Sequence, residues 1–191
     1  MIYADETTSP HFSIEFSERR ERLSNCFRLF LAIPHLIVLS AWGSLVQTLA
    51  FIQWWIILFT GKRNQSIWNM QNSWLAYGSR VYAYAYMLFD KWPAFGEKPD
   101  GEPTTYEFVY EPNTERLSNV FRLIMLIPAL FIYFALSIVT GFVLLYSWFT
   151  IVIAGKQSRG SFNFILKTHR YWIATYAYGL LMTDSYPNSN P

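Results

Sequence analysis

The stretch that decides the fold is Glu21-Arg22-Leu23-Ser24-Asn25-Cys26-Phe27-Arg28-Leu29, which returns nearly unchanged as Glu115-Arg116-Leu117-Ser118-Asn119-Val120-Phe121-Arg122-Leu123. The same offset of 94 residues keeps matching positions without a gap until Pro93 meets Pro187. A repeat of this length is a whole structural unit and not a short shared motif. The sequence therefore predicts two copies of one unit.

Each copy contains a long apolar run without a charged residue, from Leu29 to Gly61 and from Leu123 to Gly155. Such a run exceeds the roughly 20 residues that a helix needs to cross a hydrocarbon core of about 30 Å. A helix of a soluble protein would carry charges on its solvent side at every turn. The chain is 52% hydrophobic and only 15% charged, which also differs from an ordinary soluble domain. These features predict an all-α integral membrane protein.

The length of the runs allows three shapes: one long tilted helix, a helix preceded by an interfacial turn that ends at the proline, or a bent hairpin that re-enters from the same side. We favour the second shape. Pro34 and Pro128 suit the first turn of a helix, and the preceding Arg28 and Arg122 suit the headgroup zone.

The second half of each copy, 66–89 and 161–183, mixes aromatic and small residues with polar ones. It could cross the membrane or lie in the interface. The uncharged stretch 81–89 favours crossing. Each copy is then a helical hairpin, which gives about four membrane helices. An even number of crossings per copy makes the two repeats parallel.

A short alternating segment precedes each apolar run, Phe12-x-Ile14-x-Phe16 in one copy and Tyr106-x-Phe108-x-Tyr110 in the other. Period-two alternation of aromatic and β-branched residues predicts a strand. We expect the two strands to pair with each other at the membrane surface or to extend a partner's sheet. The predicted organisation is a first membrane repeat over 12–96, a polar linker over 97–105 and a second repeat over 106–191.

Lysine and arginine residues near the ends of the runs predict the orientation. With the N-terminus in the cytoplasm, eight basic residues flank the cytoplasmic side and four the other, a bias that favours cytoplasmic termini. The cytoplasmic set is Arg19, Arg20, Arg22, Arg28, Lys91, Lys98, Arg116 and Arg122, and the other is Lys62, Arg63, Lys156 and Arg159. A re-entrant or interfacial arrangement would instead place all of these charges on one face.

Four short motifs, in order along the chain, resemble the bacterial membrane family catalogued as domain of unknown function 4389. They are Leu31-Ala32-Ile33-Pro34-His35, the segment 57–63, the segment 81–88 and Asp90-Lys91-Trp92-Pro93-Ala94-Phe95. The second copy departs from the pattern, with Ala129 in place of the histidine and Asp184-Ser185-Tyr186-Pro187 as its closing motif. The resemblance implies a multi-pass protein of the bacterial cytoplasmic (inner) membrane with no established reaction.

The sequence offers little chemistry. Cys26 is the single cysteine, so the chain has no disulfide framework and no CxxC metal or redox pair. His35 is the sharpest candidate for holding a cofactor, because an imidazole inside an apolar run could ligate haem or carry a proton. It has no counterpart in the second copy, so an interfacial or backbone-bonded histidine is the favoured interpretation. We expect no cofactor, no metal and no enzymatic activity.

Several charged residues have competing interpretations. Asp90 and Asp184 could be duplicated transport carboxylates, but their place before a proline favours turns in which Asp bonds its own backbone. Arg80, inside the candidate span 66–89, would need a partner if buried and would face water if the segment is interfacial. Arg22, Arg28, Lys62, Arg116, Arg122 and Lys156 are predicted to contact lipid headgroups, and Trp54, Trp55, Trp68 and Trp148 to form interface belts.

The leading hypothesis is a non-enzymatic membrane protein that acts by packing against lipid or as an accessory or scaffold subunit of a larger membrane complex. A small transporter or channel built from two parallel repeats is the alternative. A net charge of +2 gives no reason to expect nucleic acid as a partner. A dry aromatic interior with an exposed apolar flank would favour the subunit, whereas a solvent-accessible route between the repeats would favour the carrier.

Overall fold

The computed structural model describes residues 9–96, 99 and 101–188. Within this part of the chain, four helices and two strands repeat in the order strand, long helix, short helix. The long helices each have 39 residues and the short helices each have 21. The elements are β1 (His11–Ile14), α1 (Arg22–Thr60), α2 (Gln65–Ala85), β2 (Thr104–Glu107), α3 (Arg116–Ala154) and α4 (Arg159–Gly179).

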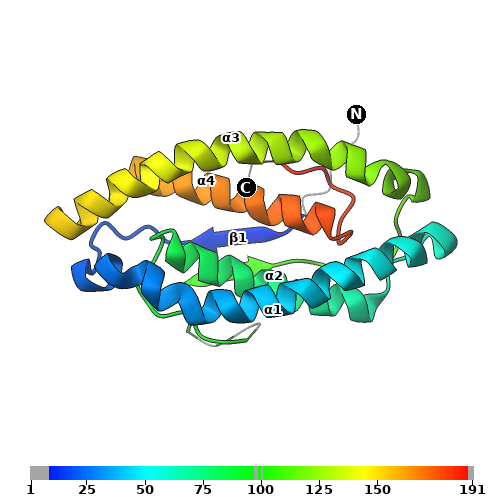
Figure 1. Ribbon diagram of the computed structural model, residues 1–191, viewed down its shortest axis with the longest axis horizontal. Helices are drawn as coiled ribbons and strands as arrows, with labels where there is room; N and C mark the ends of the chain where they lie inside the picture. Colours follow the sequence, from blue (N-terminus) through cyan, green and yellow to red (C-terminus); the bar gives the residue numbers. More distant parts are fainter. Residues whose placement is uncertain (1–8, 97–98, 100, 189–191) are drawn as a thin grey trace.

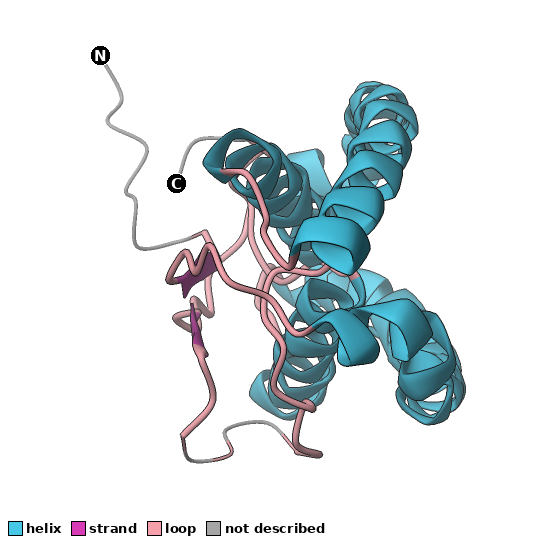
Figure 2. Cartoon of the chain, turned by 90° about the vertical axis from the view of Figure 1, so that its left-hand side faces the viewer, coloured by secondary structure: helices cyan, strands magenta, loops and turns pink. Residues whose placement is uncertain are grey.

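The elements form three layers. Helices α1 and α3 make one outer layer, α2 and α4 the middle layer, and the two strands lie on the opposite side (Figures 1 and 2). One cluster of buried apolar side chains runs through both copies. Because the middle layer is covered from both sides, α2 and α4 are much more buried than α1 and α3.

The two copies point in opposite directions. Helix α3 begins beside the end of α1 and ends beside its start, as Figure 1 shows. At one end the Arg20 N–H donates to the Gly155 carbonyl at 3.0 Å, and at the other the Thr114 N–H donates to the Gly61 carbonyl at 3.3 Å. The expectation of parallel repeats is therefore wrong. The extended segment around β2 carries the chain back along the molecule before α3 begins, so the two long helices run antiparallel.

The long helices also begin earlier than predicted. Pro34 and Pro128 lie inside α1 and α3, about three turns from their starts, and not in a first turn. The interfacial turn that we favoured before each proline is therefore wrong. The turns before Pro34 stay helical because polar contacts hold them: the Asn25 amide donates to the Glu21 carbonyl at 2.7 Å and to the Asp90 carboxylate at 3.0 Å.

Helices α2 and α4 have matching caps. The Asn64 side chain accepts hydrogen bonds from two N–H groups of the first turn of α2, and Ser158 accepts one from α4. Each helix is followed, just after its C-cap residue, by a residue with positive φ, Met87 after α2 and Leu181 after α4, and the N–H groups around this residue bond back to the last turn. Within the described part of the chain, only α1 and α3 are long and apolar enough to cross a membrane, so the expected number of about four membrane helices is not confirmed.

The two strands that the alternation predicted pair with each other, which is one of the two arrangements expected for them. They are antiparallel, with Phe12 opposite Tyr106. Both strands are shorter than the alternating segments, and β2 starts at Thr104, inside the predicted linker. Residues 97, 98 and 100 of that linker lie outside the described residues. Phe12 is buried, and its ring meets the His169 ring edge-on, with centroids 4.9 Å apart.

Helix α1 packs tightly on α2 at Gly43. A Cβ atom there would lie 3.3 Å from the Trp74 ring, whereas a Cβ at Gly141 of α3 meets nothing within 4 Å. We expect Gly43→Leu to lower the free energy of unfolding by about 1–3 kcal/mol through overpacking. Gly141→Leu is the matched control and should unfold like wild type. Thermal unfolding in mild detergent measures both, and equal midpoints for the two variants would contradict the packing.

Candidate membrane-facing surface

The outward side of α1 and α3 is apolar along its whole length. In the most apolar window of each helix, only 28% of the residues of α1 and 11% of those of α3 are buried. A core helix of a soluble protein would be mostly buried. Equivalent positions in the two copies expose large side chains to a similar degree, such as Ile37 at 64% and Phe131 at 74%. This layer therefore presents a continuous apolar face, far larger than the scattered exposed apolar residues of soluble proteins.

The inward side of the same helices carries the polar residues. The buried positions of α1 recur every three or four residues and form one stripe along the helix. The buried polar side chains are Asn25, Arg28, His35 and Gln53 in α1, and Asn119, Arg122, Thr140 and Ser147 in α3. A surface helix of a soluble protein has the opposite arrangement, with its apolar side inward.

The hydroxyl groups on the outer layer bond to the helix itself. Ser44 donates to the Ser40 carbonyl at 3.0 Å, Thr48 to the Ser44 carbonyl at 3.0 Å, and Thr60 to the Ile56 carbonyl at 2.7 Å. Ser137 of α3 donates in the same way to Phe134. Such bonds satisfy the hydroxyl without water, as an apolar solvent requires.

A buried arginine ties each long helix to the end of its short helix. In the first copy, Arg28 of α1 donates to the Tyr84 and Phe89 carbonyls at 3.1 and 2.8 Å, and it pairs with Asp90. Its guanidinium also lies over the Tyr84 ring, 4.6 Å from the centroid. Asp90 in turn accepts from the Glu21 N–H at 3.1 Å. The aspartate therefore joins three segments and does not simply close its own turn, as the sequence suggested.

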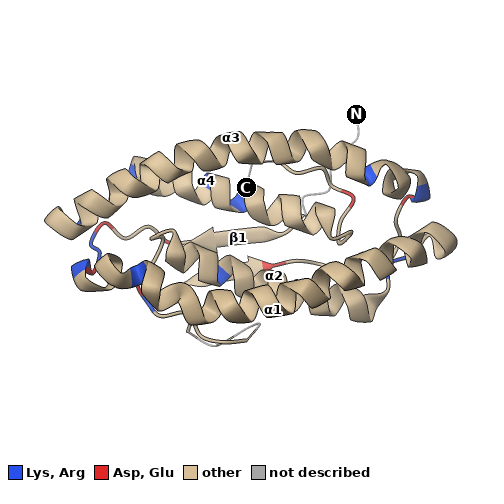
Figure 3. Ribbon diagram, in the orientation of Figure 1, with Lys and Arg blue, Asp and Glu red and all other residues tan. Residues whose placement is uncertain are grey.

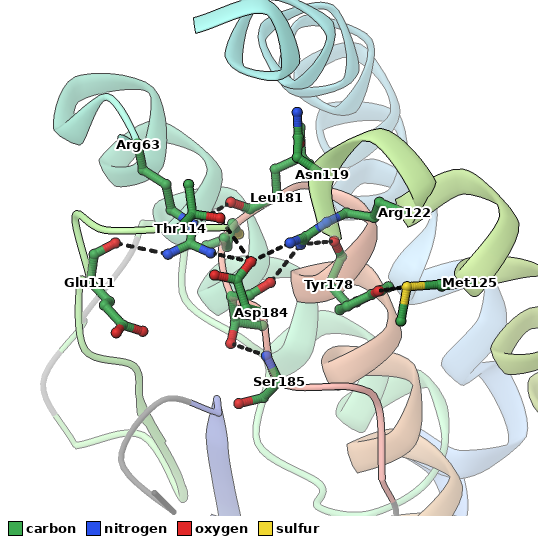
Figure 4. Close-up of polar contacts among 12 residues, drawn as sticks. Arg63, Glu111, Thr114, Asn119, Arg122, Met125, Tyr178, Leu181, Asp184 and Ser185 are labelled. Atoms are coloured by element: carbon green, nitrogen blue, oxygen red, sulfur yellow. Dashed lines mark hydrogen bonds and ion pairs between the residues drawn. The ribbon is translucent and has the colours of Figure 1, made fainter. Parts of the chain in front are cut away.

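The second copy repeats this site. Arg122 donates to the Tyr178 and Thr183 carbonyls, pairs with Asp184 and lies over the Tyr178 ring (Figure 4). Arg63 approaches Asp184 from the other side, at 2.7 Å. Burial alone would raise the pKa of the Asp184 carboxyl, but Arg63 and Arg122 outweigh this effect and hold the pKa below its usual value.

At each site, a second arginine connects the two copies. This arginine does not occupy equivalent sequence positions at the two sites. At the first site, Arg20 precedes α1 and donates to the Leu88 carbonyl at 2.8 Å and to Gln157 at 3.0 Å. At the second site, the arginine is Arg63, the counterpart of Gln157 at the offset of 94, and Thr114 occupies the place of Arg20. Sequence reasoning used Arg20 and Arg63 only as orientation signals and missed these contacts.

The six predicted headgroup residues separate into two groups. Arg28 and Arg122 are each only 2% exposed, so the prediction that they contact lipid is wrong for both. Their carbonyl and carboxylate partners draw them into the protein. Arg22, Lys62, Arg116 and Lys156 are exposed and lie at the ends of the long helices, where Figure 3 shows charge at both ends of the molecule. Their contact with lipid stays a prediction.

Two other predicted residues are buried. Trp68, expected in an interface belt, lies inside the protein and donates from Nε1 to the Met182 carbonyl at 3.2 Å. Arg80 is buried in α2, where its guanidinium donates to the Ala94 and Gly96 carbonyls. The Arg80 guanidinium therefore does not face water. Of the two interpretations of this residue, the buried arginine with partners is correct.

Two histidines are buried in aromatic surroundings. His35 of α1 has its Nδ1 atom 2.6 Å from the Tyr77 hydroxyl, and its ring stacks on Phe95 with centroids 4.4 Å apart. His169 of α4 stacks on Trp172, and burial lowers the pKa of His169 to about 3. Among the described residues, no group of three or more His, Cys, Asp or Glu side chains is placed to hold a metal ion.

The family model described as Domain of unknown function (DUF4389) matches the chain twice, over residues 22–96 and 116–189. The chain belongs to this family. The two matches coincide with the two structural copies and confirm the resemblance and the tandem repeat. The DUF4389 description names no reaction, ligand or partner. No curated protein and no solved structure matches the chain.

In this DUF4389 protein, Arg28 should matter far more to stability than Arg22, although both were grouped as lipid contacts. We expect Arg28→Met to cost about 3–5 kcal/mol of unfolding free energy, because it leaves Asp90 and two carbonyls without their donor. Arg22→Met, at an exposed position of the same helix, should stay within about 0.5 kcal/mol of wild type. Denaturant unfolding in mild detergent measures the difference, and a similar loss in both variants would refute the assigned roles.

His169 should make stability depend on pH. Its pKa is lowered from 6.5 to about 3 in the folded protein, so the unfolded chain binds more protons between these values. Stability is therefore complete above 6.5 and declines as the pH falls toward 3. We expect His169→Phe to flatten the decline in this window, and His11→Phe, at an exposed position of β1, to leave it unchanged. Unfolding midpoints recorded against pH give the test, and a wild-type slope in His169→Phe would count against it.

Proposed function

We propose that the protein is a non-enzymatic membrane protein whose α1 and α3 are immersed in the hydrocarbon of the bilayer. It acts by packing against lipid and as a scaffold or accessory subunit that holds a membrane-protein partner at the bilayer. We place it in the bacterial cytoplasmic membrane with both termini on the cytoplasmic side.

The observation that carries this proposal is the reversed polarity of the long helices. Their outward side presents large apolar side chains such as Ile37 and Phe131, while Arg28 and Arg122 point inward. Water would penalise this arrangement on both sides, because it exposes apolar surface and buries charge. Hydrocarbon favours it, since the apolar side chains meet an apolar solvent and the polar groups bond within the protein.

The interior between the two copies supports a subunit more than a carrier. The boundary between α2 and α4 is filled with aromatic rings: Tyr82 meets Trp172 at a centroid distance of 4.8 Å, and Trp74 meets Tyr176 at 5.8 Å. A Cβ atom at Gly78 would lie 3.7 Å from the Trp172 ring, so backbone and ring are in close contact. A dry aromatic interior beside an exposed apolar flank is the pattern that favours the subunit.

Aspartates introduced into the apolar face test whether α1 and α3 are immersed in hydrocarbon. We expect the double variant Ile37→Asp with Phe131→Asp to lose stable membrane association, because each aspartate in hydrocarbon costs about 3 kcal/mol. The measurement is the fraction of protein that floats with liposomes and resists extraction by high salt and alkaline carbonate. Thr105→Asp, on the exposed strand, is the matched control and should float like wild type.

The scaffold role has a separate test. The protein is purified from its native membrane in mild detergent, from wild type and from a variant that still inserts. A stoichiometric membrane-protein partner that depends on this protein for its assembly supports the role. Movement of a solute by the isolated protein in sealed liposomes would contradict it and favour a carrier.

A further inference from the structure

We propose that the long axis of the protein lies parallel to the membrane plane, with α1 and α3 embedded in a single leaflet. The ligand of the apolar face is then one lipid monolayer, α2 and α4 lie at headgroup level, and the strands face water. This inference rests on the proposed immersion of α1 and α3, and it adds that neither helix crosses the bilayer.

The strands exclude an upright orientation. They run beside the middle of the long helices, on the opposite side of the molecule (Figures 1 and 2). If α1 crossed the membrane, the sheet would lie at bilayer depth, and a two-stranded sheet has two open edges of backbone groups. Each unsatisfied group in hydrocarbon costs several kcal/mol. The exposed carboxylates of Glu15 and Glu107 would enter the hydrocarbon as well.

The length of the helices points the same way. A helix of 39 residues is about 58 Å long, nearly twice the hydrocarbon thickness of about 30 Å. To fit this length into the hydrocarbon, an upright α1 would have to tilt by about 60°, beyond the range of about 0–40° found for membrane helices. A helix lying in the plane has no such limit. Its diameter of about 10 Å fits within one leaflet of about 15 Å.

The position of the charges fits a single headgroup layer. Arg22 and Lys156 lie at one end of the outer layer, and Lys62 and Arg116 lie at the other. Figure 3 shows basic residues at both ends of the molecule. A Cβ atom built on Gly155 would lie 3.1 Å from the Arg22 side chain, and one built on Gly61 would lie 3.0 Å from the Arg116 side chain. The end of each long helix is therefore next to the first arginine of the other long helix, and each end of the molecule brings together basic residues of both copies. With the long axis in the plane, all four reach phosphate groups of the same leaflet. An upright protein would divide them between the two surfaces.

The aromatic residues of the middle layer complete the arrangement. Tyr82, Tyr86 and Trp172 lie between the apolar layer and the strands, at the depth where aromatic rings gather in membranes. From the apolar face to the strands, the molecule therefore passes from hydrocarbon-like to aromatic to charged. This order matches the composition of one monolayer read from its tail region outward.

Accessibility to a membrane-impermeant maleimide tests the orientation. Cys26→Ser provides a background without cysteine, and single cysteines are placed at Ser17 before α1, Gln65 after α1, Thr105 in β2 and Ile37 on the apolar face. We expect the first three to react from the same side of sealed vesicles and to the same extent. The cysteine at Ile37 should react only after detergent is added. Labelling of positions 17 and 65 from opposite sides would overturn the inference while leaving the immersion intact.

Depth measurements supply an independent reading. Nitroxide labels at Leu29, Leu45 and Phe59, all exposed along α1, should show equal access to oxygen and equal protection from a water-soluble paramagnetic reagent. A profile deepest at position 45 and shallow at both ends would show a crossing helix and refute the proposal. A protein that remains soluble as an oligomer, with Ile37→Cys protected without lipid, would instead refute the proposed immersion and assign the apolar face to a second copy.

Discussion

The fold depends on the burial of two guanidinium groups, those of Arg28 and Arg122. A buried charge is tolerated only when it is paired and hydrogen-bonded, and the terminal nitrogens of each guanidinium bond to two carbonyls and one aspartate, while its Nε atom has no hydrogen-bond partner. One carbonyl belongs to the last turn of the short helix and the other to the segment that follows it. Each arginine therefore fixes the end of the short helix against the start of the long helix, which leaves the rest of the long helix free to expose its apolar side.

This constraint explains why the polar residues lie inward. An ion pair near the start of α1 and another near the start of α3 set the rotation of each long helix about its axis. Once Arg28 faces inward, the residues four and seven positions further along, Ala32 and His35, face inward too. The bulky apolar side chains then fall on the opposite side. One pair of contacts thus determines which surface of a 39-residue helix meets its surroundings.

Much of the fold could be predicted from the sequence, because it depends on periodicity. The repeat, the uncharged runs and the two short strands follow from spacing alone, whereas the pairing of the strands with each other was one of two arrangements that the sequence allowed. The inward stripe was missed because the helix was expected to begin at Pro34, which left Arg28 outside it. The repeat carried a usable signal, since Asn25, Arg28 and Asp90 all recur at the same offset. The antiparallel arrangement could not be predicted, because it depends on the tertiary path of the chain between α2 and α3.

The exchanged arginines have a consequence for how the two halves recognise each other. Each site holds one aspartate and two arginines, and the second arginine comes from Arg20 at one site and from Arg63 at the other. Two first halves joined together would set Arg20 against Arg63, because Arg63 would take the place of Gln157, which accepts from Arg20. Two second halves would offer only Thr114 and Gln157, with no second cation. Each half is therefore complementary to the other half and not to a second copy of itself. A single chain that contains both halves ensures one of each in every molecule.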